Sequence, residues 1–174
     1  MIRSSIALLL FVLLTRPLGP QPLAAQAEAE VNALIDGLYA SISFDPGEEP
    51  DWDRARSFFL PEAVLVFAPR GPGSVRVMDV DGWVRDFANF YEERDIATTG
   101  FSETIAGREV TVWGNIAHTF VVFEPRIGTD PESPTVPGLD SIELVRHDGR
   151  WWVAAITSQH ASAELPIPER FRGR

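Results

Sequence analysis

The spacing of apolar residues changes from a helical period to a strand period near residue 100. Before that point, apolar residues recur three and four positions apart, which places them on one face of a helix. The clearest such stripe comprises Val31, Leu34, Ile35, Leu38 and Ile42. After residue 100, apolar and polar positions alternate, which is typical of strands. The pattern therefore predicts helices first and then a run of strands.

Caps and turns set the expected boundaries of these elements. Asp51 and Asp79 are predicted N-caps, and Gly114-Asn115 and Asp148-Gly149 are predicted tight turns. The expected helices cover residues 28–43, 52–59 and 80–94, and the expected strands cover 63–70, 75–78, 101–114, 116–127, 139–147 and 150–160. This order predicts an α+β domain, with three N-terminal helices packed on a strongly curved antiparallel sheet.

The first 27 residues read as a signal peptide. Arg3 gives a positive start, and an unbroken apolar run of nine residues follows, Ile6–Leu14. That run is too short to span a bilayer as a helix. Ala25 and Ala27 suit signal peptidase, so we expect cleavage after Ala27 and export to the periplasm or the medium. A retained N-terminal anchor is the alternative.

The remaining chain is predicted to hold one domain over residues 28–165 and an extended, mostly solvated tail over 166–174. This mature chain has 13 arginines and 25 acidic residues, a net charge near −12. Such a charge repels nucleic-acid phosphates and anionic membrane surfaces, so we expect neither nucleic acid nor membrane as a partner.

The chain contains no cysteine and no lysine. The missing residue types exclude thiol nucleophiles, disulfides, Schiff-base chemistry and a P-loop lysine. The three histidines lie at positions 118, 147 and 160, without the close pairing typical of metal ligands. We therefore expect no metal and no cofactor.

The order of motifs resembles the nuclear transport factor 2-like superfamily, which includes SnoaL-like polyketide cyclases and ketosteroid isomerases. The resemblance covers nearly all of the mature chain, and its carriers are "LYASI", "FLPEAVLVF", "GNIAHTFVVFE" and "GLDSIELVRHDGRWWVAAI". It implies a cone-shaped sheet closed by helices around a mostly apolar pocket, and dimerisation through the outer sheet face. It does not imply one reaction, because members isomerise, cyclise, dehydrate or only bind.

In ketosteroid isomerase-like members, a carboxylate base and hydrogen-bond donors lie in an apolar cavity. Tyr39 borders the apolar stripe of the first helix and is the candidate donor, with a solvent-facing hydroxyl as the favoured alternative. Asp140 and Glu143 have opposite strand parity, so at most one faces inward. Asp140 is the candidate base, although an exposed end-of-strand acid is the favoured reading.

Alternation on the strand 116–127 leaves two possible inner faces. One face carries His118, Phe120, Val122 and Glu124, and the other carries Ala117, Thr119, Val121 and Phe123. The second set is smaller and more apolar, so it suits the interior better. His118 remains a candidate catalytic residue, and Thr119 and Phe123 are candidate ligand contacts.

The last strand, "RWWVAAITSQH", is apolar on both faces until Thr157, as expected of a central strand. Strict alternation puts Thr157 and Gln159 on one face, where they could line a pocket mouth. His160 is expected to emerge into solvent at the end of the strand. On the third helix, Trp83, Phe87 and Phe90 are further candidate ligand contacts.

Three possibilities remain open at this level. The first is a cofactor-free isomerase or lyase that acts on a small apolar molecule by general acid/base chemistry. The second is a non-catalytic domain that binds a small apolar ligand or a protein partner. The third is a purely structural homodimer whose cone is filled by its own side chains. Converging titratable groups with shifted pKa values would favour the first.

Overall fold

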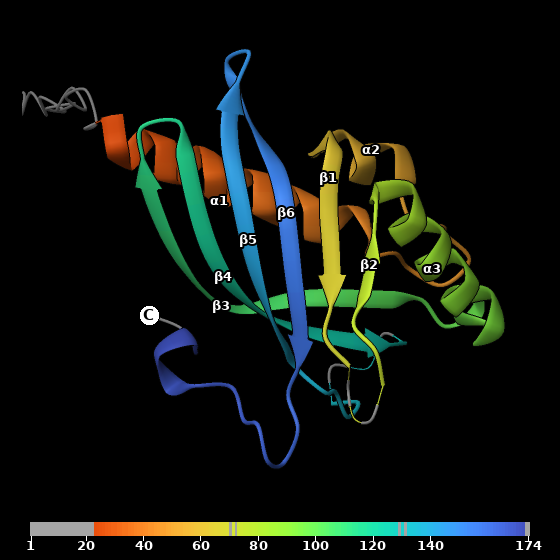
Figure 1. Ribbon diagram of the computed structural model, residues 1–174. Helices are drawn as coiled ribbons and strands as arrows, with labels where there is room; N and C mark the ends of the chain where they lie inside the picture. Colours follow the sequence, from red (N-terminus) through yellow and green to blue (C-terminus); the bar gives the residue numbers. More distant parts are fainter. Residues whose placement is uncertain (1–22, 70, 72, 129, 131, 173–174) are drawn as a thin grey trace, which may run out of the picture.

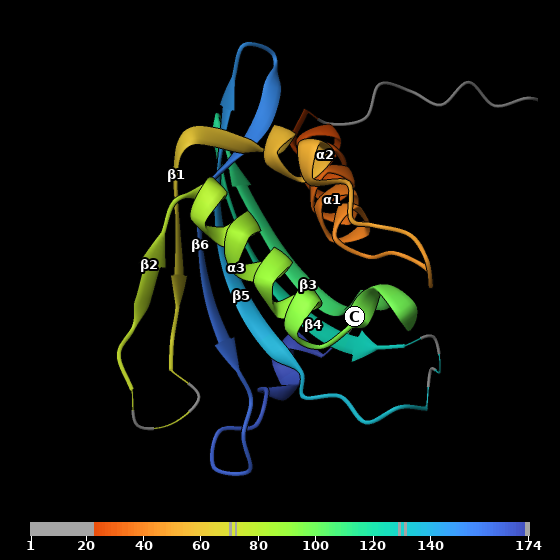
Figure 2. The ribbon, with the colours of Figure 1, turned by 90° about the vertical axis from the view of Figure 1, so that its right-hand side faces the viewer.

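The computed structural model describes residues 23–69, 71, 73–128, 130 and 132–172. Three helices lie on one side of a six-stranded curved sheet, as Figures 1 and 2 show from two directions. The helices are α1 (Leu23–Ser41), α2 (Trp52–Ser57) and α3 (Val80–Glu93), with short 3₁₀ turns η1 (Ile96–Thr98) and η2 (Glu169–Phe171). The strands are β1 (Phe59–Phe67), β2 (Arg76–Met78), β3 (Phe101–Trp113), β4 (Ile116–Ile127), β5 (Gly138–His147) and β6 (Arg150–His160). The expected fold class is confirmed.

The predicted caps and turns start and end these elements. The Asp51 side chain accepts a hydrogen bond from the Arg54 amide at the start of α2, and Asp79 does the same for Gly82 in α3. Gly114 and Asp148 have positive φ angles, which the two tight hairpin turns require. None of the helices in the described residues is both long enough and apolar enough to cross a bilayer.

The strand order is β2-β1-β6-β5-β4-β3. β3 to β6 form the antiparallel meander that alternation predicts, but β1 joins the sheet parallel to β6. In the chain, β2, α3 and the strands β3 to β5 lie between β1 and β6, and this long connection permits a parallel pairing. β6 is consequently an inner strand of the sheet, as its two apolar faces suggest.

The main core lies between the helices and the concave face of the sheet. Val31 and Ile35 of α1 are fully buried there, as are Val121 of β4 and Ile142 of β5. The predicted α1 stripe therefore packs on the sheet. Arg108 of β3 adds polar contacts to α1, because its guanidinium hydrogen-bonds Asp36 and Asn32.

Two β-bulges reverse the alternation of buried and exposed residues. In β6 the pairing with β5 shifts by one residue between Val153 and Ala155, and in β3 the pairing with β4 shifts between Ile105 and Gly107. A bulge inserts one unpaired residue, so every later side chain changes face. Beyond the β6 bulge, Ile156 and Ser158 are buried and Thr157 is exposed.

The C-terminal segment packs on the convex face of the sheet. Ile167 and Phe171 are 6% and 3% exposed, and they form a second small core with Val122 of β4. The expectation of a mostly solvated tail is therefore wrong for these residues. Outward-facing Phe120 and Val122 supply an apolar strip that the two tail side chains cover.

Residues 1–22 of the predicted signal peptide lie outside the described residues. Its last five residues, 23–27, form the start of α1, and Ala27 packs in the main core. The cleavage position remains a prediction.

Candidate functional site

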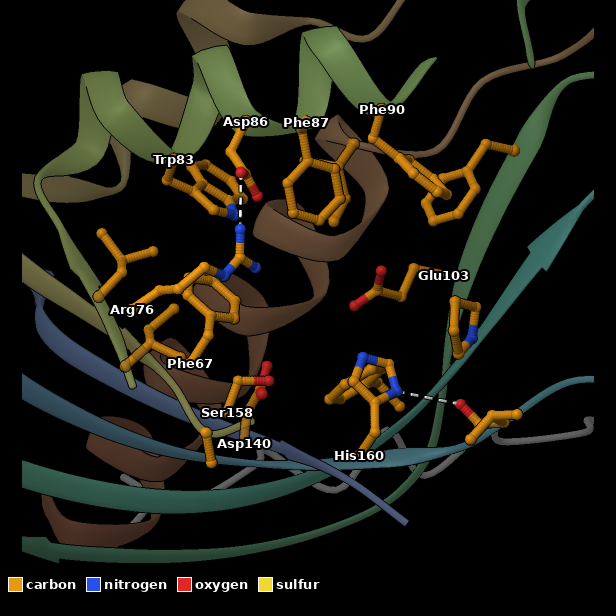
Figure 3. A pocket seen from close by; sticks show the side chains of 18 of the residues that line it. Phe67, Arg76, Trp83, Asp86, Phe87, Phe90, Glu103, Asp140, Ser158 and His160 are labelled. Carbon is orange, nitrogen blue, oxygen red and sulfur yellow. Dashed lines mark hydrogen bonds and ion pairs between the residues drawn. The ribbon is translucent and has the colours of Figure 1, made fainter. Parts of the chain in front are cut away.

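A cavity of about 710 Å³ opens between α3, the C-terminal part of α1 and the concave face of the sheet. Figure 3 shows its two kinds of lining, rings from α3 on one side and polar side chains from the strands on the other. The aromatic lining comprises Tyr39, Phe67, Trp83, Phe87, Phe90, Phe101 and Phe123. The volume, the aromatic wall and the convergent polar groups are those of a small-molecule site.

The aromatic wall comes from the predicted face of α3. Trp83 and Phe87 contact each other with ring centroids 5.4 Å apart, and Phe87 contacts Tyr91 at 5.7 Å. The spacing of four residues stacks these side chains along one side of the helix. Phe90 extends the wall toward Glu103 (Figure 3). The three predicted α3 residues, Trp83, Phe87 and Phe90, thus all line the cavity.

A hydrogen bond joins Tyr39 of α1 to Asp140 of β5 at the cavity. The tyrosine hydroxyl donates to Oδ2 of Asp140 over 2.7 Å, and the two residues are 4% and 8% exposed. The structure thus overturns both favoured readings of the sequence, the solvent-facing Tyr39 and the exposed Asp140. It brings together two of the three predicted catalytic residues.

Burial raises the pKa of Asp140 to about 6. The neighbouring Ser158 hydroxyl and the hydrogen bond from Tyr39 lower this pKa, because they stabilise the carboxylate. Burial also raises the pKa of Tyr39 well above its usual value, and the charge of Asp140 adds to this rise. Tyr39 is therefore a fixed proton donor over the whole physiological range.

Glu103 of β3 is a second carboxyl group in the cavity, and sequence reasoning missed it. Burial and the neighbouring charge of Asp140 raise its pKa to about 8. Its side chain keeps part of its surface exposed, but that surface faces the cavity and not bulk water (Figure 3). The shielding of the carboxyl from solvent therefore decides the direction of the pKa shift.

The two carboxyl groups have different protonation states at neutral pH. Asp140, with a pKa of about 6, is mostly ionised at pH 7, whereas Glu103, with a pKa of about 8, is mostly protonated. One cavity thus holds a proton acceptor and a proton donor at the same pH. Such a matched pair is what acid/base catalysis requires.

His160 also lines the cavity. Its ring meets that of Phe123 at 5.1 Å, and its Nδ1 lies 3.3 Å from the carbonyl oxygen of Val136. The expectation that it emerges into solvent is wrong, because the β6 bulge turns it to the concave face together with Ser158.

The same bulge explains why Thr157 and Gln159 do not line the cavity. Strict alternation places Thr157 and Gln159 on the same face as the core residues Trp151 and Val153. The register shift between Val153 and Ala155 turns them instead to the convex face. The sequence offers one signal of this irregularity, the consecutive small residues Ala154 and Ala155 within an otherwise bulky strand.

The inner face of β4 is the one that the smaller, more apolar side chains predicted. Thr119 and Phe123 face inward, and Phe123 lines the cavity while Thr119 is fully buried in the core. His118 lies on the convex face, where its Nε2 is 3.0 Å from the Ser141 hydroxyl and 4.0 Å from Glu143. The structure therefore places His118 outside the cavity, on the opposite face of the sheet from Asp140.

At the other end of the cavity, an ion pair bridges β2 and α3. Arg76 contacts Asp86 at 2.6 Å, and its guanidinium lies 5.3 Å from the ring of Phe67 (Figure 3). Within the described residues, no three side chains of the metal-ligating types converge at a common point. The side chains that line the cavity can transfer protons and form hydrogen bonds.

Comparisons with known proteins identify the fold. The sequence matches no protein-family model and no curated protein. It is similar in structure to a nuclear transport factor 2-like protein with a cystatin-like fold from Novosphingobium aromaticivorans, with a TM-score of 0.62, 12% identity, and coverage of 81% of this chain and 87% of that one. A protein of unknown function from Shewanella baltica, also nuclear transport factor 2-like, gives a TM-score of 0.56, 13% identity, and coverage of 80% and 97%.

A third similar structure, also from Novosphingobium aromaticivorans, is described provisionally as a scytalone dehydratase. Its TM-score is 0.59 and its identity 11%, and the match covers 79% of this chain and 86% of that one. At such identities the likeness establishes the fold, the cystatin-like cone of nuclear transport factor 2-like proteins, which the sequence motifs had predicted.

Proposed function

We propose that this chain, which has the nuclear transport factor 2-like cone fold, is a cofactor-independent isomerase or lyase of small, largely apolar molecules. One observation carries the proposal: a hydrogen-bonded Asp140–Tyr39 pair lies beside Glu103 in a ligand-sized, aromatic-walled cavity. The carboxyl groups supply a base and an acid at the same pH. The similar structure described as a dehydratase is consistent with elimination on this fold.

The roles follow from the protonation states. The Asp140 carboxylate removes a proton from a carbon or heteroatom of the substrate, and the Glu103 carboxylic acid returns one to another atom or to a leaving group. Tyr39 holds the Asp140 carboxyl in place through a hydrogen bond to Oδ2. The aromatic rings exclude water, which strengthens each of these interactions.

A neutral probe tests the base without knowledge of the substrate. 5-Nitro-1,2-benzisoxazole is a flat bicyclic molecule that opens when a base removes its C3 proton; the N–O bond breaks and a coloured nitrophenolate forms. We expect the protein to accelerate this opening, with a rate that rises with pH through about 6 as Asp140 ionises. The measurement is the absorbance of the product against pH.

Two variants separate catalysis from a general protein effect. Asp140→Asn removes the base in an isosteric way and should reduce the rate by about 100-fold or more. Glu143→Gln, on the same strand but exposed on the convex face, should leave the rate unchanged. A rate that is equal in both variants, or equal to that of the buffer, would contradict the proposed function.

We also propose export of the mature chain. The support is the charged start, the apolar run and the small residues at 25 and 27. Expression of the full chain in a bacterial host, followed by N-terminal sequencing of the periplasmic fraction, tests this; the expected first residue is Glu28. An uncleaved chain in the membrane fraction would instead support the retained anchor.

A further inference from the structure

Four strands of the sheet contribute one apolar residue each to a continuous row near the β3–β4 and β5–β6 turns. In the strand register, Trp113 lies opposite Ile116, Ile116 opposite Val145, and Val145 opposite Trp152. Residues that lie directly opposite each other on neighbouring strands project from the same face of the sheet. These four residues are here called the hairpin band.

The hairpin band projects from the convex face. The chain neighbour of each band residue belongs to the main core or packs against it: Val112, Ala117, Leu144 and Trp151. Because successive side chains of a strand point to opposite faces, the band itself points away from the core. Trp113 is 79% exposed and Ile116 is 55% exposed, while Val145 and Trp152 are half-buried. A contiguous apolar row of this kind in water indicates a contact surface.

The hairpin band is too narrow for a stable interface between two copies of the chain. Such an interface takes about 20–30 residues from each partner. The next row along the convex face is polar, because Thr111 lies opposite His118 and His118 lies opposite Glu143. The C-terminal segment covers Phe120, which lies beyond that polar row. The band is therefore a strip one residue deep at the end of the sheet.

The side chains of the hairpin band are those that favour the boundary between lipid and water. Tryptophan combines a large apolar ring with a polar N–H group, and it is enriched at that boundary. The ring of Trp152 lies 3.4 Å from the Arg150 guanidinium, and its Nε1 donates a hydrogen bond to the His147 carbonyl oxygen. An arginine can place its charged group among lipid headgroups while its stem stays on an apolar ring.

The net negative charge of the chain does not oppose this contact with a neutral bilayer. The repulsion expected from that charge applies to anionic surfaces. The hairpin band contains only uncharged side chains, and it lies beside the cationic Arg150. A bilayer of zwitterionic lipid is therefore the surface that the band fits best.

The N-terminal part of the chain enters the fold at the same end. α1 begins at Leu23, which is 86% exposed, and Figures 1 and 2 show this start at the end of the molecule that carries both hairpin turns. The apolar run Ile6–Leu14 is joined to Leu23 by residues 15–22, which span at most about 30 Å. While that run lies in a bilayer, as the predicted export requires, the hairpin end stays close to the lipid.

We infer that the hairpin band rests on the surface of a neutral lipid bilayer, with Trp113 and Ile116 at the level of the headgroups. The inference goes beyond the proposed function and does not depend on any reaction. Pro69 after β1 and Val136 before β5 line the cavity, and Figure 1 shows those strand ends opposite the hairpin turns. A protein docked in this way keeps that part of the cavity in water.

Tryptophan fluorescence tests the contact on the full chain. Of the five tryptophans only Trp113 is exposed, so it is the best reporter of lipid contact. Vesicles of phosphatidylcholine with brominated acyl chains should quench the emission of the wild type and shift it to shorter wavelength. Trp113→Phe should reduce the quenching by about threefold or more, because it removes the reporter that reaches the lipid.

A matched pair of variants separates the band from the N-terminal run, which is the same in both. Ile116→Glu places a charge in the band and leaves Trp113 intact, so it should reduce the quenching by about threefold or more. Val77→Glu, at a position 65% exposed on β2, should behave as the wild type. Circular dichroism shows whether the two variants are equally folded. The quenching of the wild type should persist at about 1 M salt, because the contact is apolar.

Three results would overturn the inference. The first is absence of quenching, or quenching that Ile116→Glu and Val77→Glu reduce equally. The second is loss of quenching at high salt, which would indicate adsorption by charge. The third is a dimer in size-exclusion chromatography without lipid that Ile116→Glu converts to a monomer, which would make the band an interface between copies of the chain.

Discussion

Asp140 shows how one residue's surroundings set its chemistry. The same aspartate on the convex face would have been an ordinary surface acid, like its neighbour Glu143. Turned inward, it is 8% exposed and its pKa rises to about 6. Strand parity in the sequence allowed only one of the two acids to face inward, but it could not say which, because the choice depends on how β5 meets β4 and β6.

The raised pKa of Asp140 predicts a dependence of stability on pH. Because the folded pKa is above the unfolded one, the protonated form favours folding, and this contribution is lost as pH rises through about 6. A difference of about two pKa units corresponds to about 3 kcal/mol. Asp140→Asn should therefore be more stable than the wild type at pH 8, by up to about 3 kcal/mol, and about equal to it at pH 4.

Urea denaturation of the wild type and Asp140→Asn at pH 4, 6 and 8 measures this difference. Glu143→Gln serves as the control for removal of an acid from the same strand. A variant that is less stable than the wild type by the same amount at every pH would show that Asp140 is not a destabilising buried charge.

At the scale of the element, the bulges decide which side chains reach the cavity. The periodicity of β4 contains no irregularity, and its inner face was predicted correctly from residue size. In β6 the extra residue near Ala154 reverses the alternation, so that Ser158 and His160 face the cavity and Thr157 does not. A bulge depends on the partner strand as much as on the bulged one, which is why alternation alone misplaced these residues.

Glu103 was missed for a related reason. It lies in β3 between Ser102 and Thr104, in a stretch without a strong apolar pattern, and a second bulge follows it. The helices, the strand order of the meander and the α3 aromatic face could be predicted, since each follows from local periodicity. The cavity acids could not, since they depend on contacts between distant segments.

Gly138 of β5 gives a prediction at this scale. It pairs with Phe123 of β4, and a Cβ atom placed on it would lie 2.1 Å from the Phe123 ring. Gly138→Ala must displace the ring, which contacts His160 in the cavity. We expect a loss of about 1–3 kcal/mol in the free energy of unfolding and slower opening of the benzisoxazole probe.

Chemical denaturation measures the first effect, and the absorbance of the benzisoxazole product measures the second. Gly73→Ala is the matched control, because a Cβ atom there meets only Pro69 at 3.6 Å, an ordinary contact. If Gly138→Ala were as stable as the wild type and opened the benzisoxazole equally fast, the Phe123 ring would not lie over this glycine as described.

At the scale of the whole molecule, the C-terminal segment completes the convex face. Phe171 is 3% exposed, its ring lies 4.6 Å from that of Phe120, and it shares a small core with Val122 and Ile167. The expected homodimer through the convex face remains a proposal. Any such interface would have to include the tail or lie beside it.

Phe171→Ala should destabilise the protein by about 2–4 kcal/mol, because it removes a buried ring and exposes part of the convex strip. Leu165→Ala, at a position 53% exposed, should change the stability by less than about 1 kcal/mol. Urea denaturation measures both. Size-exclusion chromatography of the same variants reports whether the uncovered strip changes the oligomeric state; equal stability of the two variants would show that the tail does not pack as described.

The central claim is that Asp140 and Glu103 form an acid/base pair that holds one proton at neutral pH. The most direct measurement is a pH titration of the side-chain carboxyl carbons by ¹³C NMR, with Asp140→Asn and Glu103→Gln to assign the two signals. The account predicts one titration midpoint at about 6 and another at about 8. Two midpoints near the ordinary values of about 4 would contradict it, because both groups would then be ionised and no acid would remain in the cavity.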